Sequence, residues 1–265
     1  MNTVAQAHSA TSPTSTTSTH SRTPPRTVVI TGASSGIGFA LARAYLERGD
    51  NVVGNGRSLE RLHAAADKLG NPGNFLAVAG DVAEPGIAAA IFARAIERFG
   101  NVDVLINNAG IFIAKPVADY SEEDVENIVG TNLKGFFYIT QQAARHMSAN
   151  RQGHIVNITA SIAMQPTLSV PALLPVLIKG GLNQATRALA LELAAYNVQV
   201  NAVAPGIIDT PMHTPQAHDF LRTLQPSGRI GATQDVVDAV LYLTDARHTS
   251  GAVLPVDGGA TAGHW

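Results

Sequence analysis

The octapeptide Thr31-Gly32-Ala33-Ser34-Ser35-Gly36-Ile37-Gly38 stands between a predicted strand and a predicted helix. Residues 27–30 before it form an apolar run typical of a buried strand, and residues 39–48 after it have helical periodicity. The three glycines therefore lie on a strand-to-helix turn, where the backbone can approach a pyrophosphate at the amino end of the helix. The hydroxyls of Ser34 and Ser35 can donate further hydrogen bonds there.

Strands and helices alternate along the rest of the chain. Further strands are predicted at residues 51–53, 75–79, 103–106, 153–158, 198–203 and 252–256, and helices at 58–69, 85–99, 121–150, 175–195 and 233–243. Regular alternation of this kind predicts a single α/β domain over residues 26–265. Its core is a doubly wound, Rossmann-like parallel sheet of about seven strands with helices on both faces. Residues 1–25 are rich in Ser, Thr and Pro, and we expect a disordered tail.

The composition of the 265 residues excludes several classes of function. The net charge is −2, so the chain has no basic field for nucleic acid or acidic lipid. It has no cysteine, which excludes disulfides and thiolate metal sites, and His213 and His218 do not complete a metal-binding motif, so no metal is expected. Because it has neither a long apolar run nor an apolar signal core, we expect a cytoplasmic protein that does not cross a membrane.

Four short motifs, in this order and spacing, give the chain its resemblance to a known family. They are the glycine-rich octapeptide, Asn107-Asn108-Ala109-Gly110, Asn201-Ala202-Val203-Ala204-Pro205-Gly206 and Val256-Asp257-Gly258-Gly259. Together they resemble the motifs of the short-chain dehydrogenase/reductase family. The resemblance implies an oxidoreductase that moves a hydride between a nicotinamide cofactor and a small molecule. It also implies assembly as a homotetramer or homodimer.

The end of the second strand bears on which cofactor is bound. Members of the family that prefer NAD carry an Asp where this chain has Gly56, and Arg57 follows. Because a guanidinium can pair with a 2′-phosphate, we expect NADP(H) rather than NAD(H). The resemblance implies the following cofactor-binding residues: Gly32, Ser34, Ser35, Ile37, Arg57, Asp81, Val82, Asn108, Ala109, Gly110, Lys179, Pro205, Gly206, Ile208 and Thr210. It also implies a substrate lid at about residues 211–227.

The catalytic residues implied by the resemblance are Asn132, Ser161 and Lys179, and Thr159 is the alternative to the serine. The family carries a tyrosine four residues before its lysine, and this chain has Pro175 there, which cannot donate a proton. A placed general acid is worth about 10²–10⁴-fold in rate. We therefore expect an NADP(H)-dependent oxidoreductase acting on a carbonyl, an alcohol or an activated alkene with an unusual catalytic group. The alternative is a silent NADP(H)-binding sensor or partner subunit.

Overall fold

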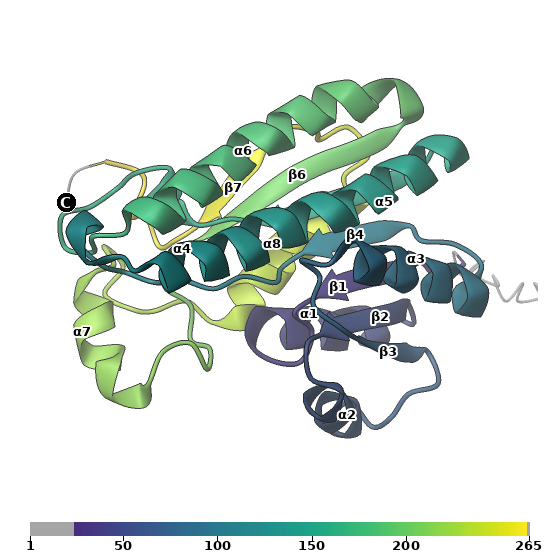
Figure 1. The fold of residues 1–265 in the computed structure, drawn as a ribbon, viewed down its shortest axis with the longest axis horizontal. Coiled ribbons are helices and arrows are strands. Elements are labelled where there is room, and N and C mark those ends of the chain that lie inside the picture. The colour runs from purple at the N-terminus through teal and green to yellow at the C-terminus, as the bar shows by residue number, and fades with distance from the viewer. Residues whose placement is uncertain (1–23, 264–265) are drawn as a thin grey trace, which may run out of the picture.

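The computed structural model describes residues 24–263, and its core is a seven-stranded parallel sheet (Figure 1). The strand order is β3-β2-β1-β4-β5-β6-β7, which confirms the predicted doubly wound sheet. Of the predicted tail, residues 1–23 lie outside the described part, whereas Pro24 and Pro25 are exposed.

The strands follow the apolar runs of the sequence. They are β1 (Thr27–Thr31), β2 (Asn51–Gly56), β3 (Phe75–Ala79), β4 (Val104–Asn107), β5 (Gly153–Ile158), β6 (Val198–Pro205) and β7 (Val253–Val256). In the centre of the sheet Val28 pairs with Val52 on one side and with Val104 on the other. These strands are continuous apolar runs because helices cover both faces of the sheet.

Two helical layers enclose the sheet. α1 (Gly36–Glu47) and α8 (Thr233–Asp245) pack on one face, and α3 (Pro85–Phe99), α5 (Gly135–Asn150) and α6 (Leu173–Leu193) pack on the other. α2 (Leu59–Lys68) lies beside β2 and β3 and begins at the Ser58 cap, whose hydroxyl accepts from the Arg61 amide. α7 (His218–Thr223) stands apart from these layers, at the lower left of Figure 1.

The helix predicted over residues 121–150 is interrupted. It consists of α4 (Glu122–Ile128), a π-helical turn over Val129–Lys134, and α5. Ser121 and Asp124 form a capping box at the start of α4. A π-turn inserts a residue into the helical repeat and turns the side chains near it. Here it carries Asn132, whose side chain is buried.

Candidate active site

A cavity of about 1300 Å³ opens at the carboxyl ends of the strands. The strand order reverses between β1 and β4, and ligands of open α/β sheets bind in the crevice at that point. Residues after β1, β2, β3, β4, β5 and β6 line the cavity, together with residues 165–170 and part of the segment that includes α7. All the predicted cofactor-binding residues lie on its wall, as do Ser161 and Thr159.

The glycine-rich turn brings α1 close to the end of β1. Gly32 and Gly36 adopt φ angles of +69° and +56°, which side chains rarely allow. At Gly38 a Cβ would lie 2.3 Å from the Gly32 carbonyl oxygen, so only glycine fits. The Ser35 side chain does not cap α1, and the first-turn amides of the helix therefore face the cavity without a side-chain partner. Amides in this position bind anions.

The ends of β1 and β4 are held together beneath this turn. The side-chain amide of Asn108 donates to the Thr31 carbonyl over 2.9 Å. In return, the hydroxyl of Thr31 accepts hydrogen bonds from the backbone amides of Asn108, at 3.0 Å, and Ala109, at 2.9 Å. This reciprocal contact fixes the Asn-Ala-Gly segment on the cavity floor.

Two arginines stand at the end of β2. Arg57 is exposed on the cavity wall, and Arg61 follows one helical turn later with its Nη2 atom 3.4 Å from the Ser35 hydroxyl. A Cβ on Gly56 would make only ordinary contacts, 3.6 Å from the Ser34 hydroxyl. The motifs did not predict Arg61. The signal available in the sequence was a second basic residue in the first turn of the helix that begins just after Arg57.

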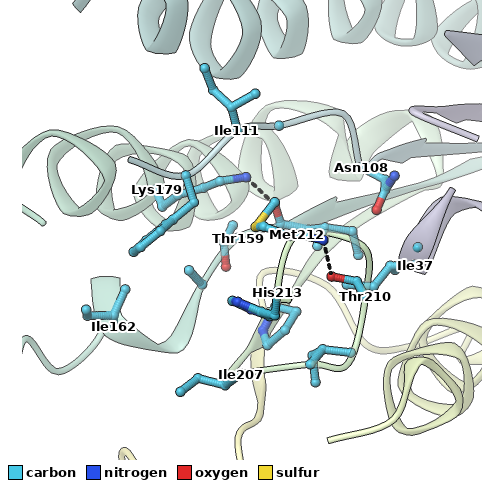
Figure 2. Close-up of a pocket in the computed structure, with 18 of the residues that line it drawn as sticks. Ile37, Asn108, Ile111, Thr159, Ile162, Lys179, Ile207, Thr210, Met212 and His213 are labelled. Carbon is cyan, nitrogen blue, oxygen red and sulfur yellow. Dashed lines mark hydrogen bonds between the residues drawn. The ribbon is translucent and has the colours of Figure 1, made fainter. Parts of the chain in front are cut away.

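Lys179 reaches the cavity from α6. Its ammonium donates to the Ile158 carbonyl over 2.7 Å, and Figure 2 shows this bond. The side chain is buried, and burial lowers the pKa of Lys179 to about 8. A group with this pKa exchanges its proton near neutral pH, because its charged form lacks the solvation it has in water.

Asn132 lies behind the wall and is not among the lining residues. Its side chain accepts from the Ile111 amide at 2.8 Å and donates to the Ile111 carbonyl at 2.9 Å. A Cβ on Gly110 would be 3.3 Å from both the Asn132 oxygen and the Lys179 nitrogen, so the two side chains flank Gly110. In this structure Asn132 therefore holds the loop after β4.

The two hydroxyls predicted as alternatives differ in their surroundings. Thr159 donates to the Val203 carbonyl over 3.3 Å, so its proton is directed toward β6. Ser161 begins the next 3₁₀ turn, and its side chain makes no hydrogen bond within residues 24–263. Both are buried and both line the cavity.

Pro175 lies in the first turn of α6, one turn before Lys179. It is buried, and it does not line the cavity. The first turn of a helix accepts proline because its amides have no partner inside the helix. The predicted start of this helix at about residue 175 is two residues late, since α6 begins at Leu173.

Several lining residues are outside the predicted cofactor-binding and catalytic residues, although Met212, His213 and Leu221 fall within the predicted lid at residues 211–227. Six of them are apolar, namely Ile111, Phe112, Ile162, Val170, Met212 and Leu221, and others, such as Gln165, Thr167 and Gln225, are polar. One is titratable, His213, which follows Met212 and is half-buried. Burial, then repulsion from His218, lowers the pKa of His213, and Asp209 opposes this shift.

Two further searches covered residues 24–263. Within that range no three His, Asp or Glu side chains are grouped so that they could hold a metal ion. None of the helices in the described part combines the length and the apolar composition that crossing a membrane requires.

Known proteins share this sequence pattern and this fold. Residues 26–220 match the family described as short chain dehydrogenase. The cis-4-hydroxycyclohexanecarboxylate dehydrogenase of Sinomonas cyclohexanicum is 38% identical over 249 residues, covering 89% of this chain and 97% of the relative. The 2-(R)-hydroxypropyl-CoM dehydrogenase of Xanthobacter autotrophicus is 36% identical over 257 residues, covering 89% and 99%.

Two solved structures have the same architecture. ElxO with NADP bound superposes with a TM-score of 0.85 at 27% identity, covering 90% of this chain and 100% of that one. The 3-ketoacyl-(acyl-carrier-protein) reductase of Brucella melitensis, complexed with NADH, gives a TM-score of 0.84 at 30% identity, covering 89% and 98%. The match over most of the sequence, together with the sheet order, establishes that the chain belongs to the short-chain dehydrogenase family and is an oxidoreductase.

Proposed function

We propose that the protein is an NADP(H)-dependent oxidoreductase that moves a hydride between the nicotinamide and a small carbonyl, alcohol or activated alkene. The observation that carries the choice of cofactor is the pair of guanidiniums at the end of β2. Arg57 and Arg61 both line the cavity beside Ser35, and Gly56 offers no carboxylate there. A ribose 2′-phosphate would find two cations and a hydroxyl at this end.

The cavity residues fit the rest of such a cofactor. The first-turn amides of α1 would hold the pyrophosphate, and Gly38 lets the helix come close enough. By resemblance, Asp81 and Val82 would contact the adenine, and Pro205, Gly206, Ile208 and Thr210 the nicotinamide end. Lys179 would bind the ribose hydroxyls there. When bound, the reduced cofactor supplies the hydride.

The substrate end favours an uncharged molecule. Its wall includes the six apolar side chains from Ile111 to Leu221 named above beside the uncharged polar groups of Thr159, Ser161 and Gln165, and its titratable groups are Lys179 and His213. No carboxylate among residues 24–263 lines this end, and Asp81 lies at the end of β3. A small, mostly apolar carbonyl compound or alcohol therefore fits better than a large anion. We propose that residues 211–227 close over it as a lid.

Self-association is also part of the proposal. Large apolar side chains are exposed on the helices of one face: Phe137 on α5 is 54% exposed, and Leu177 and Leu191 on α6 are 66% and 82% exposed. Exposed apolar residues of this kind are typical of interfaces between subunits. Sedimentation of the purified protein should show a homodimer or homotetramer, and a monomer would contradict this part.

Titration calorimetry and a turnover assay test the proposed function together. We expect NADPH to bind at least about tenfold more tightly than NADH, as a charge-assisted contact worth about 1.5–3 kcal/mol predicts. With NADPH, a panel of ketones, aldehydes and enones should include substrates that are reduced. Because Pro175 supplies no acid, the protein could also bind NADPH without reducing any substrate. Tight NADPH binding with no turnover across the panel would favour a silent binding protein.

A further inference from the structure

The proposed reaction needs a proton as well as a hydride, and the following inference rests on that proposed function. When a hydride reaches the carbonyl carbon, the π bond breaks and its electron pair stays on the oxygen. A side chain placed to protonate that oxygen speeds reduction by about 10²–10⁴-fold. Within residues 24–263, the titratable side chains on the wall are few: Arg57, Arg61, Asp81, Lys179 and His213.

Three of these five groups are unsuited to the task. The guanidiniums of Arg57 and Arg61 do not release protons in proteins. Asp81 follows β3, at the same end as the arginines, and its Oδ1 atom accepts from the Ala83 amide over 2.9 Å. Lys179 and His213 remain, and both lie where the wall is apolar.

Lys179 is already engaged. Its ammonium donates to the Ile158 carbonyl, and the side chain is buried beside Gly110. Losing that proton would leave a buried carbonyl with a weaker donor. Its position on the wall suits a contact with the cofactor, which leaves the proton for the substrate to come from elsewhere.

His213 is carried on a turn that is anchored to the glycine-rich turn. Its backbone amide donates to the Thr210 carbonyl over 3.0 Å, and the Met212 amide lies 3.4 Å from the Thr210 hydroxyl. The side chain of Thr210 is in contact range of Gly36, 3.4 Å from where a Cβ would be. The backbone of the turn that carries His213 therefore lies beside the start of α1. Figure 2 shows it in the same hollow as Thr159 and Lys179.

The surroundings of His213 keep its proton exchangeable. The charged or titratable groups that face it are His218 and Asp209, and the His218 Nε2 atom is 3.5 Å from the Asp209 carboxylate. Burial and His218 lower the pKa of His213 below its ordinary value of 6.5, and Asp209 raises it. Histidine can change its charge near neutral pH, which lets it act as a general acid or base.

We propose that His213 donates the proton in carbonyl reduction and accepts it in alcohol oxidation. In reduction, the N–H bond of the imidazolium breaks and its proton passes to the substrate oxygen, while the carbonyl carbon accepts the hydride from the reduced nicotinamide. His213 is left neutral and takes a proton from solvent. In oxidation both transfers reverse, so the neutral imidazole is the active form.

The test compares His213→Gln with the unmodified protein. Glutamine keeps a polar side chain and cannot exchange a proton at these pH values. We expect NADPH binding, measured by calorimetry, to be unchanged, and kcat/KM for ketone reduction to fall at least about a hundredfold. In the unmodified protein, reduction should slow as pH rises through the pKa of His213, and oxidation should speed up. In His213→Gln, neither of these two pH dependences should remain.

Two variants and one direct measurement complete the test. His248→Gln replaces an exposed histidine that does not line the cavity and should change neither rate nor pH profile. His218→Gln removes a neighbour that lowers the pKa of His213, so the pH at which ketone reduction slows should move upward. An NMR titration of the His213 imidazole should give the same pKa as the pH dependence of the reduction rate.

The failures can be told apart. A His213→Gln protein that reduces ketones at the unmodified rate and with the same pH profile overturns the role of His213 and leaves the proposed function standing. An unmodified protein that binds NADPH and reduces nothing overturns both.

Discussion

The ammonium of Lys179 donates to the main-chain carbonyl of Ile158 at the end of β5, over 2.7 Å. A buried chain of amides and hydroxyls supports this arrangement. Asn107 donates to Asn157 at 2.8 Å, and Asn157 donates to Thr186 on α6 at 2.9 Å. The strands β4 and β5 are thus fastened to the helix that carries Lys179, so the ammonium has a fixed place on the cavity wall.

Replacing Lys179 should weaken cofactor binding. Lys179→Met removes a charged donor, and a hydrogen bond to a charged group is worth about 1.5–3 kcal/mol, so we expect NADPH to bind roughly ten- to a hundredfold more weakly. The pKa of Lys179 is lowered from 10.5 to about 8 by burial, so the ammonium is lost as pH rises through about 8. Calorimetry on the unmodified protein should show the NADPH affinity falling over that range.

Lys68→Met is the matched control, because Lys68 is exposed on α2 and does not line the cavity. It should bind NADPH as the unmodified protein does, with the same pH dependence. An unchanged affinity in Lys179→Met would show that the ammonium does not contact the cofactor.

The two arginines at the end of β2 should make the protein bind NADPH more tightly than NADH. Arg57→Ala should reduce NADPH affinity roughly tenfold or more while leaving NADH affinity nearly unchanged, since only NADPH carries the 2′-phosphate. Arg61→Ala should act in the same direction, and the double variant should bind both cofactors alike. The measurement is the ratio of the two dissociation constants at fixed ionic strength, because salt screens exposed charges.

Arg94→Ala provides the comparison for a general loss of positive charge, as Arg94 is exposed on α3 and outside the cavity. It should leave the ratio unchanged. Equal affinities of the unmodified protein for NADPH and NADH would contradict the assignment of the two arginines.

The strand-to-helix turn and the alternation of elements predicted the fold well, because both depend on local patterns. Gly38 is one example. The nearby Gly32 carbonyl leaves no room for a side chain there, so the glycine of the motif is required by the local structure. The π-turn at Val129–Lys134 was not predicted, since its residues continue a helical pattern. What distinguishes it is tertiary: Asn132 binds the backbone of Ile111, 21 residues earlier in the chain.

The cavity residues also divide into those that local sequence patterns predict and those that tertiary contacts place. Those in the motifs after the strands were predicted, because the carboxyl ends of parallel strands meet at one edge. His213 was considered as a metal ligand and falls within the predicted lid at residues 211–227, but nothing in its neighbours predicts that its side chain shares the cavity wall with Lys179. That placement depends on the segment after β6 returning to the glycine-rich turn, where Thr210 lies near Gly36, 174 positions earlier in the chain.

Introducing a tyrosine at Pro175 should add a second proton donor. Pro175→Tyr would place a phenol one helical turn before Lys179, on the same face of α6. The nearby ammonium would lower the pKa of the phenol. We expect ketone reduction to rise about tenfold or more, the lower part of the range for a general acid. The gain should be largest above the pKa of His213, where the imidazole no longer supplies a proton.

The double variant Pro175→Tyr/His213→Gln separates the two donors, and it should regain activity that His213→Gln alone lacks. Because Pro175 is buried, the unfolding midpoint of each variant must be measured beside its rate. A folded Pro175→Tyr protein that binds NADPH and gains no rate would show that the phenol does not reach the substrate.

Acid should destabilise the fold through two partly buried histidines. His154 on β5 is partly buried, and burial first, then the charge of Arg26, lowers its pKa below the ordinary 6.5. Burial also lowers the pKa of His146. As pH falls below about 6.5, these histidines bind protons more readily in the unfolded chain than in the folded one, so the free energy of unfolding falls with pH.

Urea denaturation at pH 7.5 and pH 5.0 should show this decrease in the free energy of unfolding. In His154→Gln the difference between the two pH values should be smaller, because a residue that cannot be protonated no longer favours the unfolded state in acid. In His248→Gln, where the histidine is exposed, it should be unchanged. An equal decrease in all three proteins would place the acid sensitivity outside His154.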